Sequence, residues 1–321
     1  MTLLVTGSAG HLGEALMRAL RAAGEDARGV DRLASSFTTH IGSITDAAFV
    51  ADAMRGVRAV IHAATLHKPH VATHSRQAFV DTNVTGTLGL LEAAVAAGVR
   101  AFVYTSSTSA FGSALTPGPD APAAWITEAV TPIPRNIYGV TKVAAESLCE
   151  LFHRDQGLPV IVLRTSRFFP EVDDNAEVAA AYDLANVQAN ELLYRRVDIE
   201  DVVSAHRLAL DRAPDIGFGR YIVSATTPFG WEELAELRED APAVVRRVFP
   251  DFEAIYAARG WRMFPSLDRV YVNAAAMRDL GWQPKRDFRA ALDALAKGED
   301  FRSDLARAVG SKGYGVDSLP P

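Results

Sequence analysis

A glycine-rich turn joins the first predicted strand of this 321-residue chain to its first predicted helix. The stretch TGSAGHLG, residues 6–13, follows an apolar β-type run and opens the amphipathic run HLGEALMRALRAAG. Gly7, Gly10 and Gly13 let the chain turn sharply and let backbone amides approach an anion at a helix N-terminus. A tight turn without a ligand is the alternative, but the strand–turn–helix context favours a dinucleotide-binding α/β unit.

Strand-like and helix-like runs then alternate along the first two-thirds of the chain. Four strands are expected, at the runs DARGVDR, VRAVIHAA, VRAFVYTSS and LPVIVLRTS. Between them lie runs with helical periodicity, including one long helix expected at 76–98 and another from 138 to about 156. This alternation predicts βαβ units and therefore an α/β fold with a doubly wound parallel sheet of the Rossmann type.

The alternation weakens after residue 168. Helical runs dominate residues 169–309, while GRYIVSA is expected to be a strand that completes the main sheet. We therefore expect an NAD-binding Rossmann domain at 1–168 and a smaller, mostly helical substrate lobe at 169–309. The Gly- and Pro-containing end, residues 310–321, is expected to be a loose tail.

Composition excludes several classes of function. The net charge of −6 and the pI of about 5.8 disfavour binding to nucleic acid or to an anionic membrane. A single cysteine cannot form a disulfide within the chain or supply a cysteine-rich metal site. The first residues lack the features of a signal peptide, and no apolar run is long enough to span a bilayer. A cytoplasmic protein is expected.

The acid at the end of the second predicted strand bears on the choice of cofactor. Asp31 lies 18 residues after Gly13. A carboxylate at this position can bind the ribose hydroxyls of adenosine and repel a 2′-phosphate, which favours NAD over NADP. Arg32 follows directly and offers a partner for a phosphate instead, so NADP remains the less favoured alternative.

A tyrosine and a lysine lie one helical turn apart in YGVTK, residues 138–142. Side chains at i and i+4 share a helix face, so Tyr138 and Lys142 can act on the same molecule. The spacing alone also fits a buried tyrosine beside a solvated lysine. The rest of the chain has to distinguish an acid–base pair from an ordinary helix start.

Six ordered motifs resemble the extended short-chain dehydrogenase/reductase family, in its NAD-dependent epimerase/dehydratase branch. They are TGSAGHLG, GSITD, VIHAAT, TNVTGTLGLLEAA, FVYTSSTSAFG and YGVTK, and RRVDIEDVVSAH and DLGWQPKRDF resemble signatures of the family's substrate lobe. The resemblance implies a catalytic group of Ser107, Tyr138 and Lys142. The cofactor contacts expected are Gly7, Ala9, Gly10, His11, Leu12, Gly13, Asp31, Arg32, Ser43, Ile44, Ala63, Ala64, Thr65, Asn83, Thr105, Tyr138 and Lys142.

The resemblance also implies a mechanism. Tyr138 takes the proton of a substrate hydroxyl while a hydride moves to NAD, and Ser107 hydrogen-bonds to the reacting oxygen. Since a free tyrosine has a pKa of about 10, the ammonium of Lys142 and the positive nicotinamide are needed to favour the phenolate. Lys142 is also expected to bind the nicotinamide ribose.

Two departures from the family pattern narrow the expected reaction. Dehydratases of the family carry an Asp–Glu pair after the serine, whereas this chain has Thr108 and Ser109, so dehydration is not expected. Only about thirty residues separate Arg164 from Arg195, which leaves little chain for a nucleotide-diphosphate pocket. We expect a dehydrogenase or reductase of a sugar, sugar acid or polyol. A nucleotide-sugar 4-epimerase is the main alternative, and a cofactor-sensing regulator is a third.

Substrate contacts are expected from a small polar set. The candidates are His67, Ser107, Thr108, Ser109, Arg167 and Arg196. No metal site is expected, because the histidine-rich stretch 62–74 lacks cysteines and has one nearby acid. Residues 116–134 form either a lid or a rigid surface loop. The resemblance further implies a homodimer that pairs the helix at 73–98 with the helix that begins at Tyr138.

Overall fold

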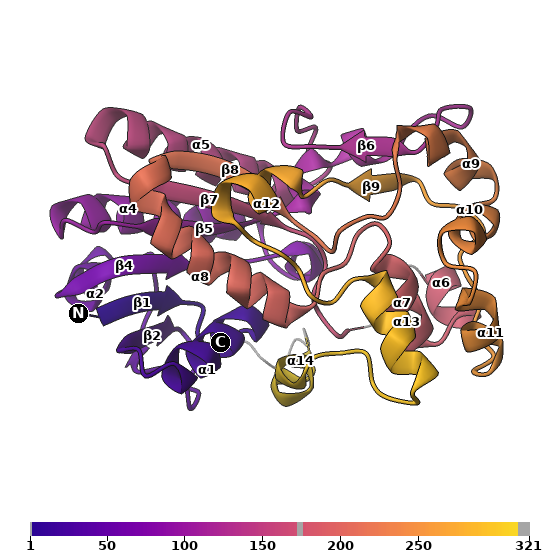
Figure 1. Ribbon diagram of the computed structural model, residues 1–321. Coiled ribbons are helices and arrows are strands. Elements are labelled where there is room, and N and C mark those ends of the chain that lie inside the picture. Colours follow the sequence, from indigo (N-terminus) through magenta and orange to yellow (C-terminus); the bar gives the residue numbers. More distant parts are fainter. Residues whose placement is uncertain (1, 172–175, 314–321) are drawn as a thin grey trace.

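The computed structural model describes residues 2–171 and 176–313 (Figure 1). Its main sheet has seven strands in the order β3-β2-β1-β4-β5-β7-β8, and every neighbouring pair is parallel. The strands are β1 (Thr2–Thr6), β2 (Ala27–Asp31), β3 (His40–Ile41), β4 (Val57–His62), β5 (Phe102–Ser107), β7 (Val160–Thr165) and β8 (Phe218–Val223). The predicted doubly wound sheet is confirmed, and GRYIVSA joins it as β8.

Helices cover both faces of this sheet (Figure 1). On one face, α1 (His11–Ala22) and α8 (Ile199–Ile216) pack against Val5 and Val103. On the other face are α2 (Ala47–Ala53), α4 (Gly86–Ala96) and α5 (Ile137–Gln156). The core residues of one strand alternate between the two faces, as the period of two in a β-strand requires.

The long helix expected at 76–98 is not a regular α-helix. It consists of α3 (Arg76–Val80), a π turn at Asp81–Thr85, and α4. A π turn holds one extra residue without breaking the helix, so the apolar periodicity of the sequence does not reveal it. The wide turn carries Asn83, whose side chain is buried. Such turns concentrate at functional sites.

The second part of the chain has a core of its own. Its helices are α6 (Ala176–Ala181), α7 (Leu184–Glu191), α9 (Leu234–Glu239), α10 (Ala241–Val248), α11 (Phe252–Ala257) and α13 (Phe288–Ala296). Buried side chains from these helices, including Tyr256 and Phe288, form one apolar cluster. The boundary at residue 168 stays a prediction.

Two further helices return to the main sheet. α12 (Ala274–Leu280) packs against α8 and β8, and α14 (Asp304–Val309) packs against α1 and α8. The segment 116–134 is anchored as well, because its strand β6 (Ala124–Ile126) pairs in parallel with β9 (Arg269–Tyr271). This pairing favours a rigid loop over a lid. Among the described residues, no helix has both the length and the apolar character needed to cross a membrane.

The described beginning of the expected tail, residues 310–313, makes contacts with the rest of the chain. The backbone N–H of Lys312 donates to Glu171 Oε1 at 3.1 Å, and its Nζ donates to Glu14 Oε2 at 2.6 Å. The Ser311 hydroxyl donates to Glu171 Oε1 at 2.9 Å. These partners are remote in sequence, so the composition of the tail does not reveal them. The remainder of the predicted tail, residues 314–321, lies outside the described residues.

Candidate active site

The glycine-rich turn lies at the carboxyl end of β1, in the middle of the sheet. Gly7 has a φ of +76°, and a Cβ there would lie 2.8 Å from the backbone nitrogen of Ala64. A Cβ on Gly13 would collide with the carbonyl oxygen of Gly7. Glycine is therefore required for β1, β4 and α1 to approach each other at this point. The turn leaves the N-terminus of α1, which begins at His11, directed at the same edge of the sheet.

Asp31 lies beside this turn at the end of β2. Its Oδ2 accepts a hydrogen bond from the backbone N–H of Ala9 at 3.0 Å, and its Oδ1 accepts one from Leu33 at 2.9 Å. The carboxylate is thereby fixed next to the predicted pyrophosphate position. Arg32 is exposed. The structure thus brings Asp31 to the place where a ribose-binding acid is expected.

The other predicted cofactor residues follow neighbouring strand ends. Ile44, after β3, is 8% exposed and packs over Gly86 of α4, while the Ser43 hydroxyl shares a hydrogen bond with Thr45. Ala63, Ala64 and Thr65 directly follow β4. The backbone N–H of Ala64 donates to Thr6 Oγ1 at 3.1 Å, which joins the ends of β1 and β4.

Asn83 connects the loop after β4 with helix α5. Its Oδ1 accepts hydrogen bonds from Thr65 Oγ1 at 3.0 Å and from the backbone N–H of Leu66 at 2.8 Å. Its Nδ2 donates to the Leu66 carbonyl at 2.8 Å and to Thr141 Oγ1 at 3.0 Å. The π turn presents this side chain between the loop after β4 and the first turns of α5. Asn83, expected among the cofactor contacts, thus has its side-chain oxygen and nitrogen bound within the protein.

The three expected catalytic residues meet at the carboxyl end of β5. Ser107 is the last residue of that strand, and Tyr138 and Lys142 lie in the first two turns of α5. Asn136 caps this helix by accepting a hydrogen bond from the Gly139 N–H at 3.0 Å. The Tyr138 and Ser107 side chains share a hydrogen bond. Lys142 Nζ donates to the Thr105 carbonyl at 2.9 Å and lies 5.9 Å from the centre of the Tyr138 ring.

Burial affects the ionisation of Tyr138 and Lys142 in opposite directions. It raises the pKa of Tyr138 to about 12, although the hydrogen bond with Ser107 opposes the shift. It lowers the pKa of Lys142 to about 7, and the carboxylate of Glu146 opposes that shift. Burial therefore favours the neutral form of both groups. Positive charge near the phenol would favour its ionised form.

A buried ion pair behind Lys142 was not predicted from the sequence. Glu146 Oε2 lies 2.7 Å from Arg164 Nη2 and 3.1 Å from Arg220 Nε, and Glu146 Oε1 accepts a hydrogen bond from Ser106 at 2.6 Å. Glu146 and Arg164 are 2% and 3% exposed. The only signal in the sequence is a glutamate four residues after Lys142, on the same helix face.

The histidines near the site have different environments. His67 stacks on Phe169 at a ring distance of 5.1 Å and lies 6.2 Å from the Tyr138 ring, so it borders the predicted substrate position. Burial is the main cause that lowers its pKa to about 3, which makes it neutral near pH 7. His62 is fully buried and shares hydrogen bonds with Thr6 and Thr87, which is a packing role.

The two arginines predicted to contact substrate form ion pairs with Glu191. Arg196 Nε lies 2.7 Å from Glu191 Oε2, and Arg167 Nε lies 3.8 Å from the same atom. Arg196 also donates from Nη1 to the carbonyl of Phe169 at 3.0 Å. The other polar candidates, Thr108 and Ser109, follow Ser107, and Thr108 is buried. Within the described ranges, no three His, Cys, Asp or Glu side chains are grouped so that they could hold a metal ion.

Known proteins with similar sequences cover most of this chain. A 3-beta-hydroxysteroid dehydrogenase of Mycolicibacterium neoaurum is 26% identical over 88% of this chain and 86% of its own length. A GDP-6-deoxy-D-mannose reductase of Pseudomonas aeruginosa is 31% identical over 74% of this chain and 78% of its own length. The chain spans less than half the length of several other curated relatives that it matches.

Solved structures and a family description agree with the fold. A short-chain dehydrogenase/reductase superfamily protein from Agrobacterium tumefaciens, solved with bound NAD, aligns with a TM-score of 0.66 and 25% identity. The alignment covers 92% of this chain and 96% of that protein. Residues 3–222 match the NAD dependent epimerase/dehydratase family, a range that includes the glycine-rich turn, Ser107, Tyr138 and Lys142. The chain therefore belongs to the NAD dependent epimerase/dehydratase family, as the motifs of its sequence had indicated.

Proposed function

We propose that the protein is an NAD-dependent oxidoreductase that moves a hydride between NAD and a hydroxyl or keto group of a small carbohydrate-like substrate. The observation that supports this most strongly is that Ser107, Tyr138 and Lys142 meet at the carboxyl end of β5, with Lys142 one helical turn after Tyr138. A hydroxyl placed against this pair meets both a proton acceptor and a hydrogen-bond donor.

The residues at the carboxyl edge of the sheet fit NAD. The glycine-rich turn leaves no room for side chains at Gly7 and Gly13, which suits close approach of a pyrophosphate to the backbone. Asp31 would hold the adenosine ribose and Lys142 the nicotinamide ribose. When bound, NAD supplies the hydride acceptor and a positive charge near the phenol. Electrostatic attraction of this kind offsets the effect of burial on the pKa of Tyr138.

In the oxidative direction the proton and the hydride leave the same alcohol. The phenolate of Tyr138 would take the hydroxyl proton, and bound NAD would supply the acceptor for the hydride that the same carbon must lose to become a ketone. The Ser107 hydroxyl holds the reacting oxygen in place. Protonated Lys142 favours the phenolate, and Glu146 in turn favours protonated Lys142. In the reductive direction Tyr138 returns the proton to the oxygen.

A carbohydrate-like substrate is supported by the chain between β7 and α8. This segment is short, and Thr108 and Ser109 replace the acidic pair of a dehydratase. Two relatives that match most of the chain are named as a dehydrogenase and a reductase, which is the reaction class proposed here. A 4-epimerase would use the same residues with NAD held throughout the cycle. A cofactor-sensing regulator is disfavoured, because both Tyr138 and Lys142 are present.

One assay separates these candidates. Purified protein is incubated with NAD and a panel of free sugars, sugar acids and polyols, and NADH is measured. In parallel, UDP-sugars are incubated without added cofactor and analysed for a change at C4. Net NADH formation supports the proposal, whereas interconversion of UDP-sugars without net NADH would replace it with the epimerase function.

A further inference from the structure

A cavity of about 430 Å³ lies away from the catalytic residues. Its walls come from α7, from α8 near Ile199, from α14, and from the loop after β7. Helix α8 covers the face of the sheet opposite α5, which carries Tyr138 and Lys142. Ser107, Tyr138 and Lys142 are not among the described residues that line the cavity. Its size is in the range that binds small organic ligands.

Most of the wall is apolar. Leu192 and Val309 are 4% and 8% exposed and face the cavity from α7 and α14. Phe168, Val197, Ile199 and Phe301 complete this surface. The neighbouring Phe169 stacks on His67 and packs edge-on against His11, which lines the cavity, so its ring lies between the cavity and His67. Such a wall favours a ligand with an aliphatic body.

One buried side chain of the lining carries a positive charge. Arg196 is 6% exposed and lines the cavity. Its Nε pairs with Glu191 and its Nη1 donates to the carbonyl of Phe169. Within residues 2–171 and 176–313, its remaining nitrogen, Nη2, makes no hydrogen bond. A buried cation with an unused nitrogen favours an anionic acceptor in the cavity.

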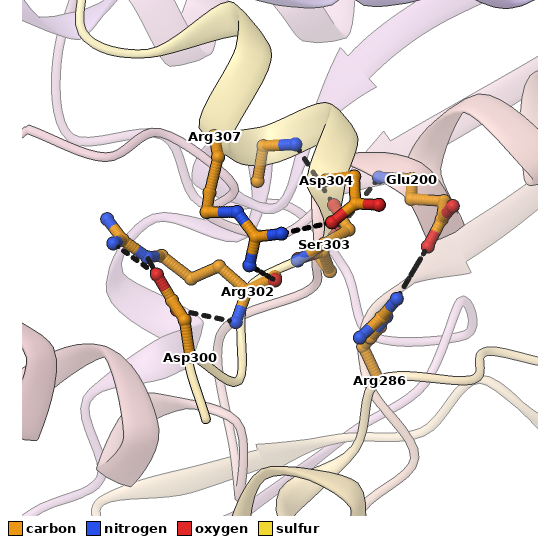
Figure 2. Close-up of polar contacts among 9 residues, drawn as sticks. Glu200, Arg286, Asp300, Arg302, Ser303, Asp304 and Arg307 are labelled. Atoms are coloured by element: carbon orange, nitrogen blue, oxygen red, sulfur yellow. Dashed lines mark hydrogen bonds and ion pairs between the residues drawn. The ribbon is translucent and has the colours of Figure 1, made fainter. Parts of the chain in front are cut away.

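Three partly exposed arginines also line the cavity, and we call the edge that they form its mouth. Arg286, Arg302 and Arg307 line it, and each pairs with an acid that does not: Glu200, Asp300 and Asp304 (Figure 2). The three arginine side chains are 37–46% exposed. Exposed ion pairs of this kind contribute roughly 0–1 kcal/mol, so they exchange partners at little cost.

The one carboxylate among the described lining residues is already bound. Asp198 Oδ1 accepts hydrogen bonds from Ser303 Oγ at 2.6 Å and from the Glu200 N–H at 2.8 Å. Its Oδ2 accepts one from the Ser303 N–H at 3.0 Å. Three hydrogen-bond donors therefore stabilise the charge of Asp198. An anion that enters the cavity is attracted by the arginines.

We propose that this cavity is a second binding site, which takes a monocarboxylic acid with an aliphatic body. The carboxylate binds Arg196 Nη2 or an arginine of the mouth, and the aliphatic body lies against α7 and α14. Ser311, which also lines the cavity, donates to Glu171, and Glu171 pairs with His11 at the start of α1. His11, which was expected to contact the cofactor, and Arg196, which was expected to contact the substrate, both line the cavity. The site thus includes the end of the glycine-rich turn but not Tyr138.

Octanoate is the probe, and its binding to the full chain is measured by calorimetry. Ala306→Trp fills the cavity from α14, whereas Ala308→Trp places the same side chain on an exposed position of that helix, outside the lining. We expect octanoate to bind with one-to-one stoichiometry. Ala306→Trp should weaken binding at least tenfold, or about 1.4 kcal/mol, while Ala308→Trp leaves it unchanged. 1-Octanol should bind at least tenfold more weakly than octanoate.

Three results would overturn the proposal: no binding of octanoate to the wild type, equal binding by Ala306→Trp, or equal binding of octanol. If Ala306→Trp does not fold, a photoreactive octanoate analogue on the wild-type chain locates the site. Labelling within residues 184–199 or 301–311 supports it, and labelling confined to other peptides contradicts it.

Discussion

At the scale of single residues, the proposed chemistry depends on how charge is distributed around Tyr138. Burial raises the pKa of this phenol to about 12, so it is protonated near neutral pH unless positive charge is close. Lys142 can provide that charge, but burial lowers its own pKa to about 7. Glu146, held by Arg164, opposes this second shift. The glutamate therefore acts on the reaction through Lys142 and is a positioning residue.

Replacing Glu146 should change the pH dependence of turnover. Glu146→Gln keeps the shape of the side chain but removes the charge that favours the Lys142 ammonium, so the pKa of Lys142 should fall further. The rate requires phenolate and ammonium together. We expect the alkaline limb of the pH–rate profile to move to lower pH.

The control for this variant is Glu150→Gln, one turn further along α5. Glu150 is 51% exposed and pairs with Arg220 only at the surface. Its replacement should leave the profile unchanged. Thermal unfolding of both variants shows whether the protein still folds when the charge that pairs with Arg164 is removed. If folded Glu146→Gln has the same pH–rate profile as the wild type, Glu146 does not act on the reaction through Lys142.

At the scale of elements, the strand–turn–helix unit at the N-terminus is constrained by two close approaches. Gly13 is the third residue of α1 and lies against the carbonyl of Gly7. This contact sets how closely α1 packs on β1. The motif in the sequence predicted the turn correctly, because the spacing of the glycines is a local property.

Gly13→Ala should therefore damage both stability and cofactor binding. The added methyl group collides with the backbone, and overpacking of this kind costs about 1–3 kcal/mol. Gly89→Ala, within α4, is the matched control, because a Cβ there meets no atom within 4 Å. Since alanine favours a helix over glycine, this control should be neutral or stabilising by up to about 1 kcal/mol. Denaturant unfolding and NAD titration measure both effects; equal losses in the two variants would contradict the collision.

Contacts between distant elements explain what the sequence could not predict. Lys312 and Glu14 are 298 residues apart, and Glu146 and Arg164, on the consecutive elements α5 and β7, are 18 residues apart. Neither contact leaves a periodic or local pattern. The π turn at 81–85 is invisible for a different reason, since the helical periodicity continues through it. The sheet, by contrast, follows from alternating patterns that each strand and helix carries by itself.

At the scale of the whole molecule, both faces of the main sheet are covered by helices, yet α5 keeps an exposed apolar position. Val140 is 49% exposed on this helix, between Tyr138 and Lys142, whose side chains are buried. Such a position suits the predicted homodimer through α4 and α5. The homodimer stays a prediction, as do the domain boundary at residue 168 and the roles of individual site residues.

A charge at Val140 tests that dimer. Val140→Asp would place a carboxylate in an apolar interface, so the mass in solution should fall from that of two chains to that of one. Light scattering coupled to size-exclusion chromatography measures this mass, and Val248→Asp, at another exposed valine on α10, is the control. A wild-type protein with the mass of a single chain would refute the predicted pairing directly.

The most direct test of the central claim is NADH formation by the wild type and Tyr138→Phe on the first substrate that the panel identifies. The account predicts that turnover falls by roughly 10²–10⁴-fold without the phenol. The affinity for NAD should stay within a factor of about two, because the ring and Lys142 remain. Turnover by Tyr138→Phe at the wild-type rate would contradict the assignment of Tyr138 as the group that moves the proton.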